Sequence, residues 1–251
     1  MTVLLLGDIT GRSRVALRMI SAVLEERGHE VLMLPTALIS NTLNLGMHEA
    51  LDTTDYLLRS LRTWEKLGIH CDIAYIGYIT GLEQARVLAK IADGLREKGV
   101  RVVVDPILGD NGKKYNSVSQ EQTEGMKLLC AHADLITPNL TEACLLADAP
   151  CGACPGEQLA RVLARGGCSV LITSAADKKG GEATLVYEDG QLTEIPFERV
   201  PGHKWGTGDL FTGLLIDGLL EGKRTVDAAR EAGNRVAAQL RGEEKSLLPE
   251  Q

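Results

Sequence analysis

The chain has 251 residues, which suits one large α/β domain or two small ones and is enough for a sizeable buried core. Hydrophobic residues make up 44% and charged residues 24%, as in an ordinary globular protein. Lys and Arg number 27 against 34 Asp and Glu, so the formal net charge of −7 argues against broad binding to nucleic acid or to an anionic membrane surface.

The N-terminus, MTVLLLGDIT, has neither the basic start nor the cleavage site of a signal peptide, and we interpret it as a first strand. No apolar run in the sequence approaches the roughly 20 residues that a membrane span needs. We therefore expect the protein in the cytoplasm, with its six cysteines mostly as thiols. Cys151 and Cys154 form a single C-x-x-C without a second pair or a nearby histidine, so we predict that this motif is dispensable.

Short β-like runs alternate with amphipathic helical stretches over the first two thirds of the chain. In chain order the predicted elements are strand 2–7, helix 13–27, strand 30–35, helix 52–67, strand 72–77, helix 82–98, strand 101–106, helix 119–132, strand 134–138, helix 139–147, helix 156–165 and strand 169–173. This βαβα order predicts an α/β fold with a mostly parallel central sheet and helices on both of its faces.

The last third of the chain has a different pattern. Two β-like runs in 183–197 flank Asp189-Gly190, which predicts a β-hairpin. Two closing helices are predicted at about 208–221 and 225–241, and the polar tail 242–251 is expected to fray. Because no repeat, linker or change of composition divides the sequence, we predict a single domain over residues 1–251.

The stretch KWGTGDLFTG (204–213) places small residues directly before an acid and an apolar run of helical spacing. A helix is predicted to begin near Gly208, with unpaired N–H groups and the positive end of the helix dipole at its start. Glycines let a ligand approach those N–H groups, so the stretch predicts an anion hole with Asp209 at its mouth. An acidic first turn after a flexible loop fits the same residues and stays open as the alternative.

Other nucleotide-binding motifs are absent from the sequence. The nearest approach to a P-loop, GDNGKK at 109–114, has the wrong spacing, and the first strand lacks G-x-G-x-x-G. In open α/β sheets, ligands bind beyond the carboxyl ends of the strands. The polar residues predicted there are Asp8, Ser40, Asn41, Thr42, Tyr78, Asp105, Asp110, Asn111, Asn139, Glu142, Thr173 and Asp209.

Several separated stretches, in consistent order from about residue 3 to 240, resemble one known family. GTGDLFTG (206–213) resembles the anion-hole signature of the ribokinase-like superfamily. The segments similar to its vitamin B6 branch, the pyridoxal/pyridoxamine kinases, are DPILGDNGKKY (105–115), ITPNLTEACLL (136–146), IGYITG (76–81) and, more loosely, ALISNTLNLG (37–46) and GDITGRSR (7–14). The resemblance implies a three-layer α/β/α ribokinase-like fold without a sugar-kinase lid, and a homodimer.

The resemblance also implies an activity, the ATP-dependent phosphorylation of the 5′-hydroxymethyl group of pyridoxal, pyridoxine or pyridoxamine. Asp209 would be the general base, while N–H groups of Gly206, Thr207 and Gly208 would hold the transferring phosphoryl group. Asp8, Ser40, Asn44 and Tyr78 would line the pocket for the vitamer. On the ATP side, Asn139 and Glu142 would organise Mg²⁺ through waters, and Asp105, Thr137 and Thr173 would lie along the phosphates. Such a reaction needs positioning and charge neutralisation more than covalent help from the protein.

Alternatives to this interpretation remain at three points. The sequence departs from the B6 branch at the vitamer end, where Arg12 and Ser13 replace an aromatic residue and a glycine, so a kinase of hydroxymethylpyrimidine or a related small alcohol stays open. Asn139 and Glu142 also fit a plain helix-capping box. A non-catalytic nucleotide-binding regulator is the alternative of another class, and the presence of Asp209 together with Asn139 and Glu142 argues against it.

Overall fold

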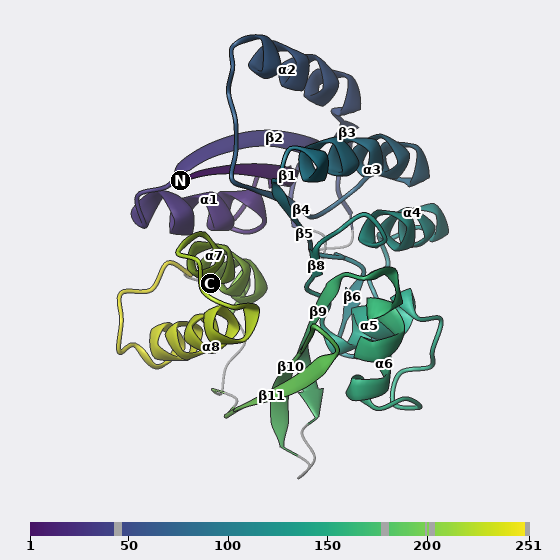
Figure 1. Cartoon of the computed structure of the whole chain (residues 1–251), viewed down its shortest axis with the longest axis vertical. Helices are drawn as coiled ribbons and strands as arrows, with labels where there is room; N and C mark the ends of the chain where they lie inside the picture. The colour runs from purple at the N-terminus through teal and green to yellow at the C-terminus, as the bar shows by residue number, and fades with distance from the viewer. Residues whose placement is uncertain (43–46, 177–180, 199, 201–203, 249–251) are drawn as a thin grey trace. The chain divides into compact units, whose positions relative to one another are not determined.

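The structure, a computed structural model, describes residues 1–42, 47–176, 181–198, 200 and 204–248. The chain forms two compact units, the first from Met1–Tyr78 and Val200–Gln251 and the second from Ile79–Arg199. Each unit combines strands with helices (Figure 1). That the two units act as one functional domain stays a prediction.

The first unit is built on four strands in the order β4-β1-β2-β3. They are β1 (Thr2–Thr10), β2 (Glu30–Ile39), β3 (Ala50–Asp52) and β4 (Ile73–Ile76). β1 runs parallel to β2 and to β4, and β3 pairs antiparallel with β2. The side chains of residues 3–6 in β1 are at most 2% exposed, as expected of a strand covered on both faces.

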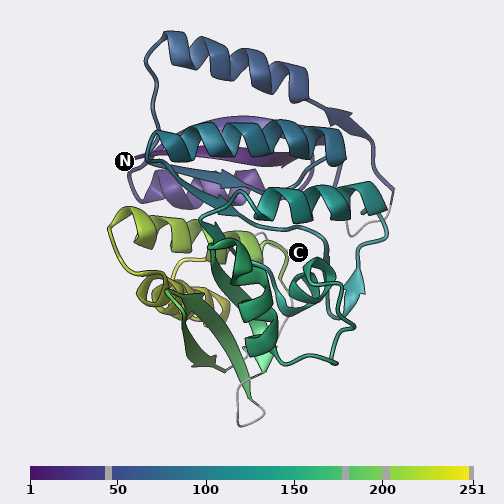
Figure 2. The same cartoon turned by 45° about the vertical axis from the view of Figure 1, so that its right-hand side comes forward.

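Helices lie on both sides of these strands. α1 (Leu17–Glu26) and α2 (Thr54–Lys66) are on opposite sides of β1 and β2 in both views (Figures 1 and 2). α7 (Thr207–Leu220) packs against α1 and against α8 (Thr225–Arg241). Every residue of α7 from Thr212 to its end is buried, so α7 is a core helix.

α1 begins later than the sequence predicts. The apolar pattern favours a helix over 13–27, but Ser13 and Ala16 have φ angles of 68° and 52°, which a right-handed helix does not accommodate. Nη1 of Arg18 donates to the carbonyl oxygen of Ser13 (3.0 Å) and so supports this turn. The prediction for residues 13–16 is therefore wrong, and their backbone N–H groups are available for contacts outside α1.

Among the described residues of the second unit, five strands pair in the order β11-β10-β9-β8-β5. They are β5 (Arg101–Val104), β8 (Leu135–Ile136), β9 (Ser169–Ala176), β10 (Glu182–Glu188) and β11 (Gln191–Phe197). β5, β8 and β9 run parallel, whereas β10 pairs antiparallel with β9 and β11. The hairpin of β10 and β11 turns at Asp189 and Gly190, whose positive φ angles of 51° and 77° match a type I′ turn and confirm the predicted hairpin.

The helices of the second unit are α3 (Leu82–Glu97), α4 (Gln120–Cys130), α5 (Leu140–Leu146) and α6 (Gly156–Leu163), with a 3₁₀ turn at Ala164–Gly166. α3 packs on β5 and α4, and α6 packs on β9 and β10. All predicted strands and helices occur, so the predicted α/β fold with mostly parallel pairing is confirmed. The sequence did not predict β3 or the small hairpin of β6 (Gly109–Asp110) and β7 (Lys113–Lys114), because two or three residues carry no periodic pattern.

The C-terminal tail, expected to fray over 242–251, is tied to α8 as far as residue 248. The N–H group of Leu247 donates to Oε1 of Gln239 (3.0 Å), and Leu248 is only 6% exposed. Residues 249–251 lie outside the described residues. The prediction rested on the overall polarity of the tail and did not allow for Leu247 and Leu248, of which Leu248 is buried.

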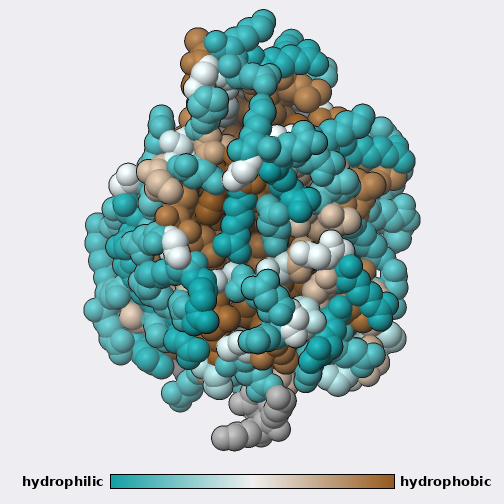
Figure 3. Space-filling view, in the orientation of Figure 1, coloured by the Kyte–Doolittle hydropathy of each residue, from teal (hydrophilic) through white to brown (hydrophobic). Residues whose placement is uncertain are grey.

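The surface seen in Figure 3 is mostly hydrophilic. Within the described part of the chain, no helix has the length and apolar character needed to cross a membrane. Two apolar side chains that do remain exposed, Leu38 (42%) and Leu51 (60%), are partners across β2 and β3. They lie at the end of the strand order of the first unit, where β3 is the edge strand.

Candidate active site

The sequence predicts an anion hole at the start of α7, which lies in the first unit. Gly206 is the N-cap of α7 with a φ angle of 81°, and a Cβ atom there would lie 3.2 Å from the carbonyl oxygen of Arg14, so the position favours glycine. The N–H group of Leu210 donates to the carbonyl oxygen of Gly206 (2.8 Å), which leaves the N–H groups of residues 207–209 ahead of the helical ladder. Oγ1 of Thr207 donates to the carbonyl oxygen of Lys204 (2.7 Å) and fixes the turn.

Asp209 lies in the first turn of α7 and is anchored by the backbone that precedes α1. Its Oδ2 atom accepts a hydrogen bond from the N–H group of Ala16 (2.8 Å). Its Oδ1 atom has no hydrogen-bond partner among the described residues. Burial raises the pKa of Asp209 above its ordinary value, and the Ala16 N–H group partly opposes that rise. The carboxylate is thus oriented by one oxygen while the other is available to a ligand.

Asp8 places a second carboxyl group in the same unit. A register shift between Gly7 and Asp8 interrupts the pairing of β1 with β2, and the Asp8 side chain beyond it is 7% exposed. Burial raises the pKa of Asp8 to about 7, and the charge of Asp209 adds to the effect. Near neutral pH, the protonated and charged forms of Asp8 are therefore both populated, whereas an ordinary aspartate is charged.

Two buried hydroxyl groups near the ends of β1 and β2 have no hydrogen-bond partner in the described part of the structure. They are Oγ1 of Thr10, 2% exposed, and Oγ1 of Thr42, 5% exposed. An unpaired buried hydroxyl costs free energy, so such groups are candidates for contact with a ligand. Thr10 is two residues after Asp8 in β1, and the alternation of side chains along a strand places both on one face.

The remaining residues predicted on the vitamer side differ in their surroundings. Ser40 is exposed, and its Oγ atom donates to Asn41 Oδ1 (2.8 Å) and accepts from the N–H group of Glu49 (3.0 Å). Tyr78 is 5% exposed, and its carbonyl oxygen accepts from Thr36 Oγ1 (2.6 Å). Asn44 lies outside the described residues. A ligand role for Ser40 or Tyr78 stays a prediction.

Asn139 and Glu142, in the second unit, form a complete capping box at the start of α5. Oδ1 of Asn139 accepts from the N–H group of Glu142 (3.0 Å), and Oε2 of Glu142 accepts from the N–H group of Asn139 (2.9 Å). Asn139 Nδ2 also donates to the carbonyl oxygen of Gly109 (2.8 Å), and Glu142 Oε1 accepts from the N–H group of Leu108 (3.1 Å). The capping interpretation of this motif is therefore correct, and any metal role comes in addition to it.

Glu142 is nevertheless in an unusual electrostatic position. It is 5% exposed, and burial, followed by the charge of Asp105, raises its pKa well above the ordinary value. Asp105 is itself 9% exposed. Two buried carboxyl groups repel each other when both are charged, and a cation near them would remove that cost. Each carboxylate oxygen of Glu142 has accepted one N–H group and retains capacity for a further contact.

The other two residues predicted on the ATP side follow neighbouring strands of the second unit. Thr137 comes directly after β8, and its Oγ1 atom is buried without a hydrogen-bond partner among the described residues. Thr173, in β9, makes an isolated parallel bridge with Asn139, and its N–H group donates to the carbonyl oxygen of Pro138 (3.0 Å). The structure therefore brings Thr137, Asn139 and Thr173 to the same end of the parallel strands β8 and β9.

Cys151 is exposed and Cys154 half-buried, and neither forms a disulfide. Over the described residues, no group of three or more His, Cys, Asp or Glu side chains is arranged to hold a metal ion. The dispensability of the C-x-x-C motif stays a prediction.

Sequence reasoning missed the contact between Asp209 and the N–H group of Ala16, because a backbone donor carries no sequence signal. It also missed Thr10, although its spacing of two from Asp8 was available as a signal.

The chain is similar in sequence to a known family and to individual kinases. A sequence model of a family described as phosphomethylpyrimidine kinase matches residues 23–248. Pyridoxal kinase PdxY of Pasteurella multocida is 30% identical over 190 residues, which cover 72% of this chain and 66% of that protein. A hydroxymethylpyrimidine/phosphomethylpyrimidine kinase of Rhizobium meliloti is 30% identical over 159 residues, which cover 60% of this chain and 58% of that protein. The chain thus spans less than two thirds of the length of these relatives.

A solved structure is similar over a larger share of its length. It is the crystal structure, with pyridoxal, of a Bacteroides thetaiotaomicron protein described as a phosphomethylpyrimidine kinase. It is 30% identical, has a TM-score of 0.85, and the match covers 96% of this chain and 87% of that chain. The likeness extends through both units.

The raised pKa of Asp8 predicts a pH dependence of stability. The folded-state pKa, about 7, is above the unfolded value of 3.8, so the contribution of Asp8 is complete below the unfolded pKa and is lost as pH rises through about 7. We expect Asp8→Asn to remove up to about 4 kcal/mol of this decline in the free energy of unfolding between pH 4 and pH 8. Urea unfolding at several pH values, with the exposed Asp55→Asn as control, measures the difference. An unchanged pH slope in Asp8→Asn would contradict the buried, raised carboxyl.

Proposed function

Because the chain belongs to the phosphomethylpyrimidine kinase family, we propose that it transfers the γ-phosphoryl group of ATP to the 5′-hydroxymethyl group of a B6 vitamer. The observation that carries the proposal is the start of α7, where Asp209 is anchored through Oδ2 by the Ala16 N–H group beside a glycine-capped helix N-terminus. A carboxylate next to an anion-binding backbone is what phosphoryl transfer to an alcohol requires.

In the first unit, Asp209 accepts the proton of the substrate hydroxyl at Oδ1. The raised pKa of Asp209 makes it a better base than an ordinary aspartate, and a loose transition state releases the hydroxyl proton late, so a moderate base suffices. The N–H groups of Gly206, Thr207 and Gly208 hold the transferring phosphoryl group. Asp8, with Ser40, Asn44 and Tyr78, contacts the vitamer.

In the second unit, Asn139 and Glu142 position the nucleotide side. Mg²⁺, when bound, supplies charge neutralisation to the phosphates, and it prefers oxygen ligands with several waters retained. The buried carboxyl groups of Glu142 and Asp105 fit such an ion through waters, because a cation would offset their mutual repulsion. Asp105, Thr137 and Thr173 lie along the ATP phosphates in this proposal, and the unpaired Oγ1 of Thr137 supports it.

The named relatives favour a B6 vitamer over a pyrimidine as the acceptor. One relative is a pyridoxal kinase, and the similar solved structure contains pyridoxal. The Rhizobium meliloti relative keeps a hydroxymethylpyrimidine as the alternative substrate. A panel of pyridoxal, pyridoxine, pyridoxamine and hydroxymethylpyrimidine with Mg-ATP separates them: we expect the highest kcat/KM for a B6 vitamer. A higher value for hydroxymethylpyrimidine would reverse the assignment, and ATP binding without turnover of any alcohol would favour the non-catalytic regulator.

The function also predicts the effect of removing the base. Asp209→Asn keeps the size of the side chain and an oxygen for the Ala16 N–H group, so the variant should fold with a similar melting temperature. Its kcat should fall by about 10²–10⁴-fold, the usual contribution of a general base, while the affinity for ATP stays similar or rises slightly. Steady-state kinetics and thermal unfolding of the same preparation decide the matter. Near-normal turnover in a folded Asp209→Asn protein would show that Asp209 is only a helix-start residue.

A homodimer and a cytoplasmic location remain parts of this proposal. The exposed cross-strand pair Leu38 and Leu51 at edge strand β3 supports self-association, because exposed apolar pairs on an edge strand are usually covered.

We expect light scattering after size-exclusion chromatography to give twice the monomer mass. Leu51→Glu, which adds a charge to this apolar pair, should shift that mass toward the monomer. A matched control is Leu67→Glu, which changes an exposed leucine just after α2. A dimer unaffected by Leu51→Glu would place the interface elsewhere, and a monomeric native protein would refute the homodimer.

A further inference from the structure

The packing of α7 against α1 in the first unit follows a single stripe of residues. The stripe on α7 has a spacing of four residues, which brings its members to one face of the helix, and it consists of Asp209, Gly213 and Asp217. Their partners on α1 or beside its ends are, in the same order, Ala16, Val23 and Arg27. The two helices therefore run parallel, with their N-terminal ends together.

The middle contact of the stripe sets only how closely the helices approach. A Cβ atom at Gly213 would lie 2.9 Å from Cβ of Val23, so the backbone of α7 comes directly against α1. A contact between a glycine and an aliphatic side chain has no preferred direction. It does not by itself fix the position of α7 along its axis, so the polar contacts at the two ends must do so.

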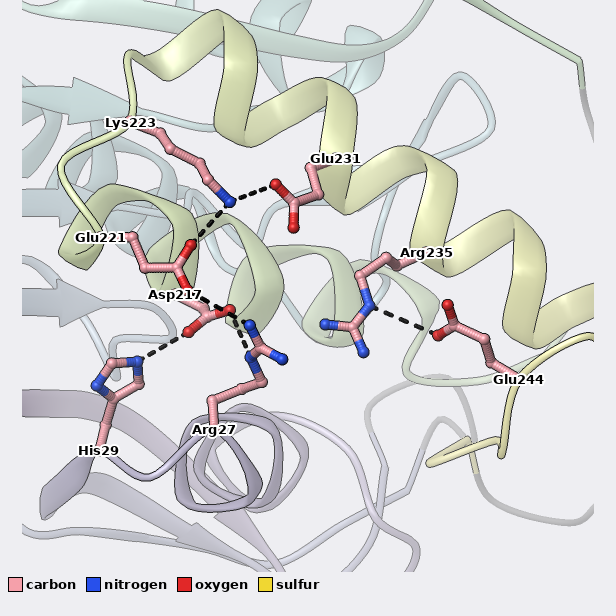
Figure 4. Close-up of polar contacts among 8 residues, drawn as sticks. All are labelled: Arg27, His29, Asp217, Glu221, Lys223, Glu231, Arg235 and Glu244. Atoms are coloured by element: carbon pink, nitrogen blue, oxygen red, sulfur yellow. Dashed lines mark hydrogen bonds and ion pairs between the residues drawn. The ribbon is translucent and has the colours of Figure 1, made fainter.

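The contact at the far end of the stripe is directional and buried (Figure 4). Asp217 is 4% exposed, and its two oxygens have separate partners, Arg27 Nε at Oδ2 (2.8 Å) and His29 Nε2 at Oδ1 (2.8 Å). Gly28, between the two partners, has a φ angle of 83° and ends α1, so Arg27 and His29 both reach the same carboxylate. Charge-assisted hydrogen bonds with low exposure are among the stronger polar contacts in proteins.

The other charged groups around this contact are more exposed and form a second layer. Glu221 accepts from Arg27 Nη2 (3.4 Å) and pairs with Lys223 Nζ (2.7 Å), which also contacts Glu231. In Figure 4, Lys223 and Glu231 lie on the other side of Asp217 from Arg27 and His29. Because exposed ion pairs contribute little, the directional hold on α7 at this end comes mainly from Asp217.

We propose that Asp217 is a positioning residue for the reaction: with Arg27 and His29 it fixes the axial register of α7 on α1, and thereby keeps Asp209 Oδ2 on the N–H group of Ala16. The two polar contacts are eight residues apart on one helix, about 12 Å along its axis, so only one register satisfies both. This inference rests on the proposed function, in which Asp209 is the base.

The proposal predicts a catalytic effect at a distance. Asp217→Asn removes the negative charge and replaces one of the two oxygens by an NH2 group, so the hold of Arg27 and His29 on α7 is weakened. We then expect α7 to shift on α1 and kcat to fall about 10-fold or more, as small misplacements of a catalytic group do. The KM for ATP should change little. The hydrogen bond from Ala16 lowers the pKa of Asp209, so its weakening should move the acid limb of the kcat–pH profile to higher pH. The charge of Asp209 affects the pKa of Asp8, so the profile is repeated in an Asp8→Asn background to show that the acid limb belongs to Asp209.

Glu221→Gln is the matched control, because it removes an acid from the same cluster without touching Asp217, and it should leave both kcat and the acid limb unchanged. Arg27→Gln keeps a donor toward Asp217, so its effect on kcat and on the acid limb should be smaller than that of Asp217→Asn. It replaces Asp217→Asn in the test if that variant folds poorly. A lower melting temperature with unchanged kcat and acid limb in both variants would show a purely structural role and overturn the proposal. Failure of the proposed function is a separate result, since it appears as retained turnover in Asp209→Asn.

Discussion

The hydrogen bond from the Ala16 N–H group to Asp209 Oδ2 is the contact on which the account of the first unit depends. It joins the backbone just before α1 to the first turn of α7, and it orients a carboxylate whose second oxygen has no partner among the described residues. Ala16 has a positive φ angle of 52°, which a right-handed helix does not accommodate, so α1 begins after it and its N–H group is free to bond to α7. The carboxylate that we propose as the base is thus held by main chain, which a side-chain substitution does not easily remove.

In the second unit, a carboxyl group, that of Glu142, is held in place through a capping box with Asn139. Asn139 and Glu142 satisfy each other's backbone N–H groups and also reach Gly109 and Leu108, so the loop before α5 and the turn at 108–109 are fixed together. The result is a rigid frame that keeps a buried carboxyl group beside Asp105 despite the electrostatic cost. Structural and functional interpretations of this motif are therefore compatible, since a capped and rigid carboxylate is also a well-positioned one.

The sequence predicted the elements well because their hydrophobic periods are long and clear, as in β1 and α3. It failed where a few residues with unusual dihedral angles decide the outcome: nothing in the pattern of 13–16 shows that Ser13 and Ala16 are left-handed. Gly206 was a usable signal for the start of α7, because a glycine before an acid and an apolar run indicates a helix N-terminus with a left-handed residue, as found at Gly206.

At Asp217 the sequence does contain a signal, but it does not identify the partners. An acid within the apolar run LLIDGLL of a core helix needs a buried partner, and that signal was present, but the identity of the partners is a property of the packing of α1 against α7. Residues 27 and 29 are nearly 190 positions away in the sequence, and no local pattern connects them.

In the mechanism that we propose, Asp209 is an ionisable base, held by the backbone of residue 16 and made more basic by burial. Carbon-13 NMR of aspartate carboxyl groups measures it most directly, with the Asp209→Asn protein used to assign the resonance. We expect the Asp209 resonance to titrate with a pKa above that of an ordinary aspartate. A pKa at or below the ordinary value would contradict it, because the carboxylate would then be stabilised as an ion and poorly suited to accept a proton.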